Sequence, residues 1–439
     1  MAMFLLVGVS TRAIAESALY SGFAVMAIDY FGDFDQRRLC PALGLKTDLG
    51  LKPSVKSLLQ IAREVSSREI QLEKYNTSEH HLEGVIYTSG PENHPDELQL
   101  WEQQGLLVGN NTSTLRQVRD PWQLWKALRQ IGVLTPPFYA VEEWNPDWAA
   151  KRWIIKPITS GGGHGIRPLE RNKKGALAQL STLGDKSSFI IQQLVHGIPA
   201  SATFIADGRR AFLLGTSRQL AGPAERAASP FTYAGNIVPL SLPANPKLLT
   251  LESQLATIAD HLTTTFGLRG LNTLDFIVND DGIWVLEVNP RWSASVELIE
   301  KWRQELLFPR HLAACGKNTR DTPDARLNLP ARGRVIDNGS SRCFWGKAIV
   351  YARLPLQVEP KKEIEYLYQQ GLRDIPVPGT IIGSGQPICT VLARAESDYS
   401  CWRKLQALSA WARKVLGKTF LRNYHDHDHG LLLTTSFMR

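Results

Sequence analysis

Hydrophobic and polar positions follow two alternating periods along the first quarter of the chain. Short apolar runs at Met3 to Val9, Phe23 to Asp29 and Gly84 to Tyr87 predict strands. Between them, Arg12 to Ser21 and Ser54 to Glu64 carry apolar residues at the helical period. Strands that alternate with helices are typical of a parallel sheet covered by helices. We therefore predict an α/β domain over residues 1–112.

A later pattern predicts a hairpin. Leu271 to Val278 and Ile283 to Val288 are rich in large apolar residues, and the four residues between them end in an Asp-Gly step typical of tight turns. Because side chains on a strand repeat every second residue, Glu287 and Asn289 lie on one face. Folding of the hairpin brings Asp275 beside them.

These three side chains offer oxygen ligands at one end of a rigid ribbon. Mg²⁺ binds one or two protein carboxylates and completes its octahedron with water and nucleotide phosphates. Asp275, Glu287 and Asn289 are therefore predicted to hold Mg²⁺, or Mn²⁺ in its place, together with a nucleotide.

A phosphate clamp is predicted upstream of the hairpin. Trp153 to Pro157 has the pattern of a short buried strand that carries Lys156, and the glycine-rich segment Ile158 to Ile166 follows it. Consecutive glycines let backbone N–H groups approach phosphate oxygens, and the lysine can pair with the same charge. The segment matches neither the Walker loop nor the dinucleotide fingerprint. A plain flexible turn is the alternative interpretation, but the hairpin carboxylates favour the nucleotide.

Taken together, these segments resemble the ATP-grasp superfamily. Its pattern is a strand-borne Lys, a Gly-rich flap, a hinge that holds adenine, and a Glu-x-Asn with an acidic residue about a dozen positions earlier; here 287 − 275 = 12. The hinge candidate is Ser188 to Gly197, where the superfamily usually carries a Glu at the position of Gln192 or Gln193. The resemblance covers roughly residues 115–316 and rests on four motifs in the same order.

The resemblance implies a role for each matching residue. ATP and Mg²⁺ are the implied cofactors, Lys156 is expected at the inner phosphates, and Arg291 is expected at the γ-phosphate or at an acylphosphate. The implied nucleotide-binding residues are Lys156, Gly161, Gly162, Gly163, Gln192, Gln193 and Val195.

One position departs from the family pattern. Many ATP-grasp enzymes place a second phosphate-binding lysine where this chain has Pro121. Arg119 or Lys126 could take its place, and the sequence does not decide between them; Lys126 also suits a solvated position on a helix over Trp122 to Ile131.

The acceptor side of the site is less defined. Ser10 and Thr11 follow the first strand, where they can cap a helix. Alternatively, Ser10, Arg12 and Asp29 to Asp33 line the acceptor side, because open α/β sheets bind ligands at the carboxyl ends of their strands. Arg218 is a further candidate for binding an acceptor carboxylate.

The rest of the chain is predicted to form smaller units. A Pro- and Arg-rich linker over 318–334 precedes strands at Cys343 to Tyr351, Ile375 to Ile382 and Pro387 to Ala393. This part resembles the β-rich closing domain of biotin-carboxylase-like ATP-grasp proteins, in particular the predicted carboligase group. The expected organisation is α/β over 1–112, a two-lobed α+β ATP-grasp domain over 113–317, a small β-rich domain over 318–397, and a helix with a tail over 398–439. The histidines of the tail, His425 to His429, suit either a metal or a solvated segment.

Composition limits the functional classes. The chain has 439 residues, 43% of them hydrophobic, and a formal net charge of +8 with a pI near 9.2, which favours anionic ligands. Basic residues are spread along the chain and no nucleic-acid motif appears, so no nucleic-acid partner is expected. The five cysteines form no Cys-x-x-Cys pair, and no apolar run has the length of a membrane span. We expect reduced thiols, a cytoplasmic location and no membrane partner.

The resemblance implies an ATP-dependent carboxylate-amine ligase that forms ADP through an acylphosphate. Small-molecule carboxylate and amine substrates follow from it, and a homodimer is compatible with it. The carboligase group includes enzymes similar to tyramine-glutamate ligases, which points to amino-acid-derived or one-carbon cofactor biosynthesis. Two alternatives remain, a biotin-carboxylase-like enzyme that activates bicarbonate and a nucleotide-binding protein without turnover.

Overall fold

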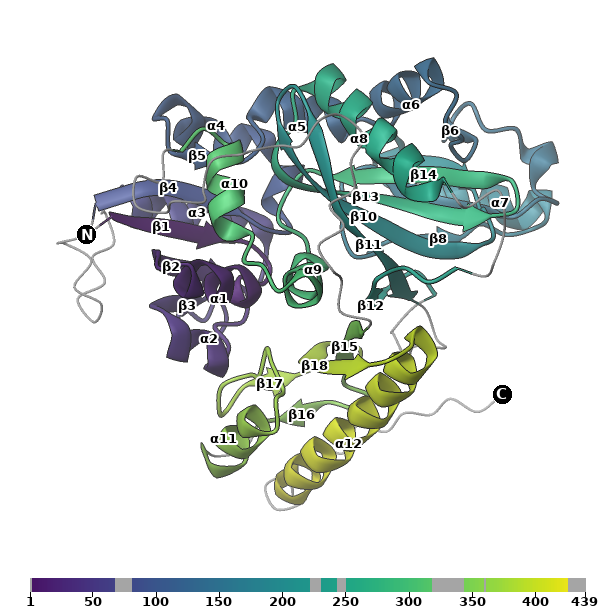
Figure 1. Ribbon diagram of the computed structural model, residues 1–439. Coiled ribbons are helices and arrows are strands. Elements are labelled where there is room, and N and C mark those ends of the chain that lie inside the picture. Colours follow the sequence, from purple (N-terminus) through teal and green to yellow (C-terminus); the bar gives the residue numbers. More distant parts are fainter. Residues whose placement is uncertain are drawn as a thin grey trace, which may run out of the picture.

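The computed structural model describes residues 2–67, 81–221, 230–242, 250–317, 343–358 and 361–424. Within these residues the strands form a parallel sheet at the N-terminal end, a small antiparallel sheet, a long antiparallel sheet and a two-stranded ribbon (Figure 1). The predicted linker at 318–334 and the histidines at 425–429 lie outside the described residues.

The N-terminal sheet is parallel, as the alternating pattern predicted. Its strand order is β3-β2-β1-β4-β5. The strands are β1 (Ala2–Val7), β2 (Ala24–Asp29), β3 (Ala42–Gly44), β4 (His81–Tyr87) and β5 (Leu107–Val108). The helices are α1 (Arg12–Tyr20), α2 (Phe34–Leu39), α3 (Val55–Ser66), α4 (Pro95–Gln103) and α5 (Thr112–Val118). Buried aliphatic side chains on both faces of β1 explain why this sequence forms a central parallel strand.

A small antiparallel sheet carries the predicted clamp and hinge. Its order is β6-β9-β7-β8. The strands are β6 (Phe138–Ala140), β7 (Trp153–Pro157), β8 (Arg167–Pro168) and β9 (Phe189–Gln193), and α7 (Lys173–Ser181) packs beside them. Trp144, Trp148 and Trp153 form a compact aromatic group that anchors this sheet. Helix α6 (Pro121–Gln130) precedes it, with Asp120 capping the N–H groups of Trp122 and Gln123.

The long antiparallel sheet contains the predicted hairpin. Its order is β14-β13-β10-β11-β12-β15-β18. The strands are β10 (Ile198–Asp207), β11 (Ala211–Ala221), β12 (Tyr233–Val238), β13 (Arg269–Asn279), β14 (Gly282–Asn289), β15 (Phe344–Tyr351) and β18 (Pro387–Ala395). Helix α8 (Leu251–Phe266) covers one face (Figure 1) through Leu255, Ile258 and Leu262, which are buried against it.

The C-terminal segments extend this long sheet. β15 pairs with β12, and β18 pairs with β15, so hydrogen bonding continues past residue 317, where the sequence suggested a boundary. The strand expected over residues 375–382 is reduced to β17 (Ile381–Ile382), which pairs with β16 (Leu356–Gln357). Pro376 and Pro378 have no N–H groups for a sheet, which explains the shorter strand. Helices α11 (Lys361–Gln369) and α12 (Asp398–Tyr424) complete this part.

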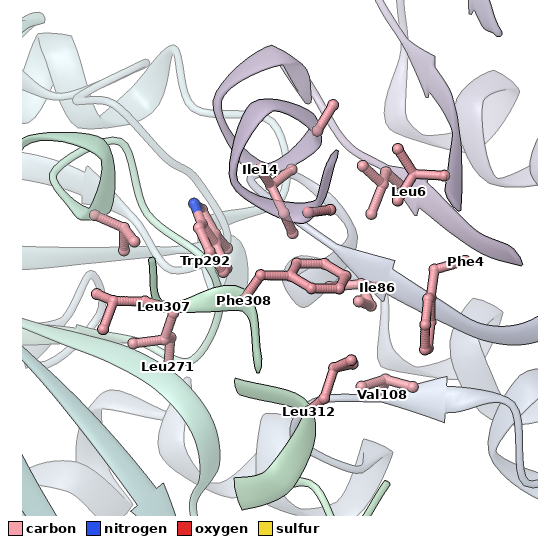
Figure 2. Packing of buried hydrophobic residues seen from close by; sticks show 14 of the residues in the cluster. Phe4, Leu6, Ile14, Ile86, Val108, Leu271, Trp292, Leu307, Phe308 and Leu312 are labelled. Atoms are coloured by element: carbon pink, nitrogen blue, oxygen red, sulfur yellow. The ribbon is translucent and has the colours of Figure 1, made fainter. Parts of the chain in front are cut away.

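One hydrophobic cluster joins the N-terminal sheet to the end of the hairpin (Figure 2). Phe308 of α10 (Phe308–Ala314) packs edge-on against Phe4 and beside Trp292, which follows β14. Ile14 of α1 and Leu312 belong to the same buried cluster. The cluster holds the carboxyl ends of β1 and β4 next to the end of β14. Helix α9 (Val296–Arg303) lies where the N-terminal, central and C-terminal parts meet (Figure 1).

Within the described residues, no helix is long and apolar enough to cross a membrane. All five cysteines are free thiols, and burial raises the pKa of Cys40 to about 12. Cys40, Cys389 and Cys401 are buried, and the reduced state of the thiols stays a prediction.

Candidate active site

The hairpin brings the predicted acidic residues together. Asp275 of β13 pairs in register with Glu287 of β14, and Thr273 pairs with Asn289. Asn289 Nδ2 donates a hydrogen bond to Asp275 Oδ2 over 2.8 Å, and Gln219 Nε2 on β11 donates to Asp275 Oδ1 over 2.8 Å. The three side chains thus share one face at one end of the hairpin, although their assignment as metal ligands stays a prediction.

Lys156 reaches the same point from the other lobe. Its Nζ lies 2.8 Å from Glu287 Oε2, which links the end of β7 to β14. Burial would raise the pKa of Glu287, but the charges of Lys156 and Arg119 outweigh it and lower the pKa to about 2. Burial and the adjacent charge of Glu287 raise the pKa of Asp275 to about 7. Below neutral pH, Glu287 is therefore ionised while Asp275 favours its protonated form.

This donor set fits Mg²⁺. Asp275 and Glu287 are adjacent like charges when both are ionised, and a divalent cation would remove the repulsion that helps to raise the pKa of Asp275. Among the described residues, no group of three or more His, Cys, Asp or Glu side chains could hold a metal. A cation here would therefore take Asn289 as its third protein ligand, with water and phosphate oxygens at the remaining positions.

The glycine-rich segment lies over this end of the cavity. Gly162 and Gly163 have φ angles of 62° and 78°, which favour glycine. Gly162 O accepts a hydrogen bond from Tyr233 N over 3.0 Å, and a Cβ on Gly163 would lie 1.8 Å from Phe231 O. Gly162 and Gly163 line the cavity, whereas His164 is exposed and its Nδ1 lies 3.1 Å from Gly161 O. The conformation explains why glycines occupy this segment.

Arg291 also lines the cavity, but it is ion-paired. Its Nε lies 2.5 Å from Glu92 Oε1, and its Nη2 donates to Asn289 Oδ1 over 3.0 Å. Glu92 thus fixes the guanidinium beside the hairpin carboxylates. The sequence analysis did not find Glu92, which is 199 residues away from Arg291.

Arg119, and not Lys126, faces this end of the site. Arg119 lines a small cavity that also contains Lys156 and Glu287. Its guanidinium donates to Ser160 O at the flap over 2.8 Å and to Val288 O of β14 over 3.2 Å. Lys126 is exposed on α6 and lines neither cavity. Pro121 lines the small cavity at the start of the helix, where it lacks a charge.

The predicted hinge forms the other wall of the end that is expected to hold the nucleotide, which is called the nucleotide end below. Gln192 pairs in register with Ile154, and Gln192, Gln193 and Val195 all line the main cavity. The apolar side chains of this end are Ile154, Ile166, Leu194, Val195, Ile277 and Leu286. Apolar side chains of this kind suit the faces of a nucleotide base, and Gln192 and Gln193 line the same cavity.

The main cavity has a volume of about 550 Å³ and extends from the hinge to the N-terminal sheet. Its far end is lined by residues of α1 and β15 and of the loops after β1, β4, β14 and α11, among them Ser10, Arg12, Thr88, Ser295, Lys347 and Asp374. A volume in this range is typical of small-molecule sites. The nucleotide end and the far end are thus parts of one space.

Several acceptor-side predictions need correction. The Thr11 side chain does not cap α1, because its Oγ1 donates to the buried Asp29 Oδ2 over 3.0 Å. Asp29 in turn accepts hydrogen bonds from the N–H groups of Phe31 and Gly32, and it does not line the cavity. Arg218 pairs with Asp398 over 3.2 Å and lies outside the cavity, so it is no longer a candidate for the acceptor carboxylate.

Arg12 joins three distant parts of the chain at the far end. Its guanidinium binds both oxygens of Glu297 on α9, over 2.6 and 3.1 Å, and Asp374 Oδ1 over 2.9 Å. Lys347 Nζ lies 2.9 Å from Glu297 Oε2. Burial alone would raise the pKa of Glu297, but Arg12 and Lys347 lower it well below its usual value. Sequence reasoning found Arg12 and missed its partners; the only local signal was that Glu297 shortly follows the hairpin.

A family model described as an ATP-grasp domain matches residues 118–295. An uncharacterized protein of Methanocaldococcus jannaschii is 21% identical over 411 residues, which cover 89% of this chain and 88% of that protein. The sequence match therefore extends well beyond the central domain.

Solved structures share the fold. The biotin carboxylase domain dimer of Hydrogenobacter thermophilus 2-oxoglutarate carboxylase, in complex with MgADP, ADP and bicarbonate, superposes with a TM-score of 0.62 and 13% identity. That match covers 95% of this chain and 90% of the other. L-amino acid ligase from Bacillus licheniformis gives a TM-score of 0.61 and 14% identity over 93% of this chain and 97% of that one. These likenesses establish the fold that the ordered motifs predicted.

Proposed function

Because this chain is an ATP-grasp protein, we propose that it is an ATP-dependent, ADP-forming ligase that joins a small carboxylate to an amine. The observation that supports the proposal is that one cavity contains both the side chains predicted to bind phosphate and a separate polar end. Such an arrangement lets a nucleotide and an acceptor meet without a covalent enzyme intermediate. The structural likeness to an amino acid ligase supports the same reaction class.

The phosphate end supplies charge and alignment. Asp275, Glu287 and Asn289 would hold Mg²⁺, which when bound neutralises phosphate charge and orients the terminal phosphoryl group. Lys156 would contact the inner phosphates, and its ion pair with Glu287 holds its Nζ beside one of the predicted metal ligands. Arg291, fixed by Glu92, would stabilise charge on the transferred group.

The reaction divides into two transfers. An oxygen of the acceptor carboxylate attacks the γ-phosphorus, the bond to ADP breaks, and an acylphosphate forms. The amine nitrogen then attacks the carbonyl carbon, the C–O bond to phosphate breaks, and the amine releases a proton. The acylphosphate must be protected from water. The flap contacts Tyr233, and this contact would shield the acylphosphate from hydrolysis.

Bicarbonate activation is the second candidate, because one structural neighbour was solved with bicarbonate. The far end of the cavity carries several polar groups that bicarbonate would not need. We therefore favour the amine-dependent reaction, with an amino-acid-derived or one-carbon cofactor precursor as the substrate class.

The test is a product analysis over a matrix of substrates. The protein is incubated with Mg-ATP, with each amino acid or dicarboxylate, and with tyramine, putrescine, ethanolamine or bicarbonate, and nucleotides are separated by chromatography. We expect ADP and phosphate, in an amount that depends on both a carboxylate and an amine. Release that depends on bicarbonate alone would favour the second candidate, and no release in any combination would favour a nucleotide-binding protein without turnover.

A further inference from the structure

A network of ion pairs lines the far end of the cavity, and its positive groups already have partners within the protein. Arg12 Nε donates to Asp374, its Nη1 donates to Glu16 and Glu297, and its Nη2 donates to Glu297. Lys347 donates to Glu297 and to Ala294 O. An incoming carboxylate would therefore have to displace an internal partner.

The backbone N–H groups of the loop beside the network also donate hydrogen bonds within the protein. Asp374 N donates to Asp35 Oδ2 over 2.9 Å, and Ile375 N donates to Asp35 Oδ1 over 3.0 Å. These bonds hold Asp374 in a left-handed conformation with a φ of 53°. Aspartate and asparagine are among the few residues besides glycine that adopt this region at low cost. The loop therefore presents the Asp374 carboxylate to the cavity in a fixed position.

One oxygen of Asp374 remains available. Oδ1 accepts from Arg12, whereas Oδ2 has no hydrogen-bond donor among the residues that the structure describes. The side chain is 21% exposed and lines the cavity, while Arg12 and Glu297 beside it are almost fully buried. A free carboxylate oxygen at the end of a cavity accepts donors and attracts positive charge.

The charge of the network points the same way. Arg12 and Lys347 contribute two positive charges, against the four carboxylates of Glu16, Glu297, Asp374 and Asp35 in ion-pair contact with them. Because the surroundings are buried, this excess is weakly screened. The far end therefore favours a cation over an anion.

We propose that Asp374 Oδ2 binds the ammonium group of the amine substrate and so determines which co-substrate enters the far end of the cavity. This inference rests on the proposed function, because it names the chemical class of the amine co-substrate that binds in the same cavity. The ligand is a small primary amine in its protonated form. Asp374 acts as a binding residue and positions the amine before its proton is released.

Direct binding tests the inference separately from turnover. Tyramine and putrescine are titrated calorimetrically into the full-length protein with MgADP present, and the same titration is made with Asp374→Asn and Glu16→Gln. Asparagine keeps the left-handed backbone and the shape of the side chain but removes the charge. Glu16→Gln removes the carboxylate charge of another partner of the Arg12 guanidinium, and Glu16 does not line the cavity.

We expect the Kd of at least one amine to rise tenfold or more in Asp374→Asn and to change less than twofold in Glu16→Gln. Glutarate, a dicarboxylate probe, should bind no more weakly to Asp374→Asn than to the wild type. Equal amine affinity in the wild type and Asp374→Asn, binding of neither amine by the wild type, or equal losses in both variants would overturn the inference.

A second arm separates this inference from the proposed function. Hydroxylamine, which is neutral near pH 8, traps an acylphosphate as a hydroxamate without needing an ammonium site. Asp374→Asn should form hydroxamate from an accepted carboxylate within twofold of the wild type, while its KM for tyramine or putrescine rises. Absence of hydroxamate in the wild type would count against the acylphosphate reaction, whereas an equal loss of hydroxamate and amine ligation in Asp374→Asn would contradict a role specific to the amine.

Discussion

The two ends of the cavity hold their charges in different ways. At the nucleotide end, Glu287 and Asp275 lie on neighbouring strands of one sheet, and Lys156 reaches Glu287 from β7 of another sheet to form an ion pair. At the far end, Arg12 joins Glu297 and Asp374 from segments hundreds of residues apart. The first arrangement leaves polar groups that a ligand can bind, whereas in the second most charged groups are paired with one another. We infer that the nucleotide end is built mainly for chemistry, and that the far end serves both folding and recognition.

The largest expected effect on activity is at Glu287. Glu287→Gln keeps the shape of the side chain but removes the charge expected to hold Mg²⁺, so ADP release should fall by roughly a thousandfold or more. Asp275→Asn should have a smaller effect, because the raised pKa of Asp275 shows that its charge is less favoured. Thermal unfolding should remain close to that of the wild type in both variants. Near-normal ATP consumption by Glu287→Gln would remove the basis for the site assignment.

Stability should respond most at Arg12. Arg12→Met leaves the buried carboxylates of Glu297 and Asp374 without their cation, and loss of one partner from a buried ion network typically costs about 3–5 kcal/mol. Denaturant unfolding would measure this. The matched control is Arg38→Met, because Arg38 also joins the N-terminal part to the C-terminal part, through the exposed pair with Glu365. That variant should lose at most about 1 kcal/mol, and similar losses in both variants would contradict a structural role specific to the buried network.

Nucleotide affinity should separate Lys156 from Lys126. Lys156→Ala should raise the Kd of ATP at least tenfold, on the order of 1.4 kcal/mol, because a charge-assisted phosphate contact is lost. Lys126→Ala should change it less than twofold, since that side chain is exposed and outside both cavities. Equilibrium binding with a fluorescent ATP analogue measures both. A larger effect at Lys126 would mean that Lys126, and not Arg119, replaces the phosphate-binding lysine that is absent at Pro121.

The last prediction concerns the pH dependence of metal binding. Burial and the adjacent Glu287 raise the pKa of Asp275 to about 7, so the free carboxyl holds a proton below neutral pH. A metal ion must displace that proton, and its affinity should therefore increase as the pH rises toward 7, by up to about tenfold per pH unit. Titration of Mn²⁺ followed by water proton relaxation, with ADP present, would show the slope. Asp275→Asn should flatten it; a wild-type affinity that is constant between pH 5.5 and 7 would argue against this coupling.

The same contrast explains what could be predicted from the sequence. Asp275 and Glu287 are joined by a short turn, so strand periodicity and turn chemistry were sufficient to place them together. Lys156 and the glycines after it form another local pattern. Arg12 and Asp374 are 362 residues apart, and no local pattern encodes their contact. Glu92 beside Arg291 is missed for the same reason.

The fold shows a similar limit. The alternating pattern predicted the parallel N-terminal sheet, because each strand there is followed by a helix that must cross over. The strand pattern at Cys343 to Tyr351 predicted β15 but not its neighbour, since side-chain alternation defines the two faces of a strand and leaves its edge partners open. Pairing with β12 thus became evident only in the structure.

The most direct test of the central claim follows an oxygen atom. A carboxylate that supports ADP release is labelled with ¹⁸O, and the released phosphate is analysed by mass spectrometry after one turnover with Mg-ATP and an amine. If the carboxylate is phosphorylated before the amine attacks, one labelled oxygen appears in inorganic phosphate and ADP is the nucleotide product. Label in AMP, or inorganic phosphate without label, would contradict the acylphosphate route proposed for this cavity.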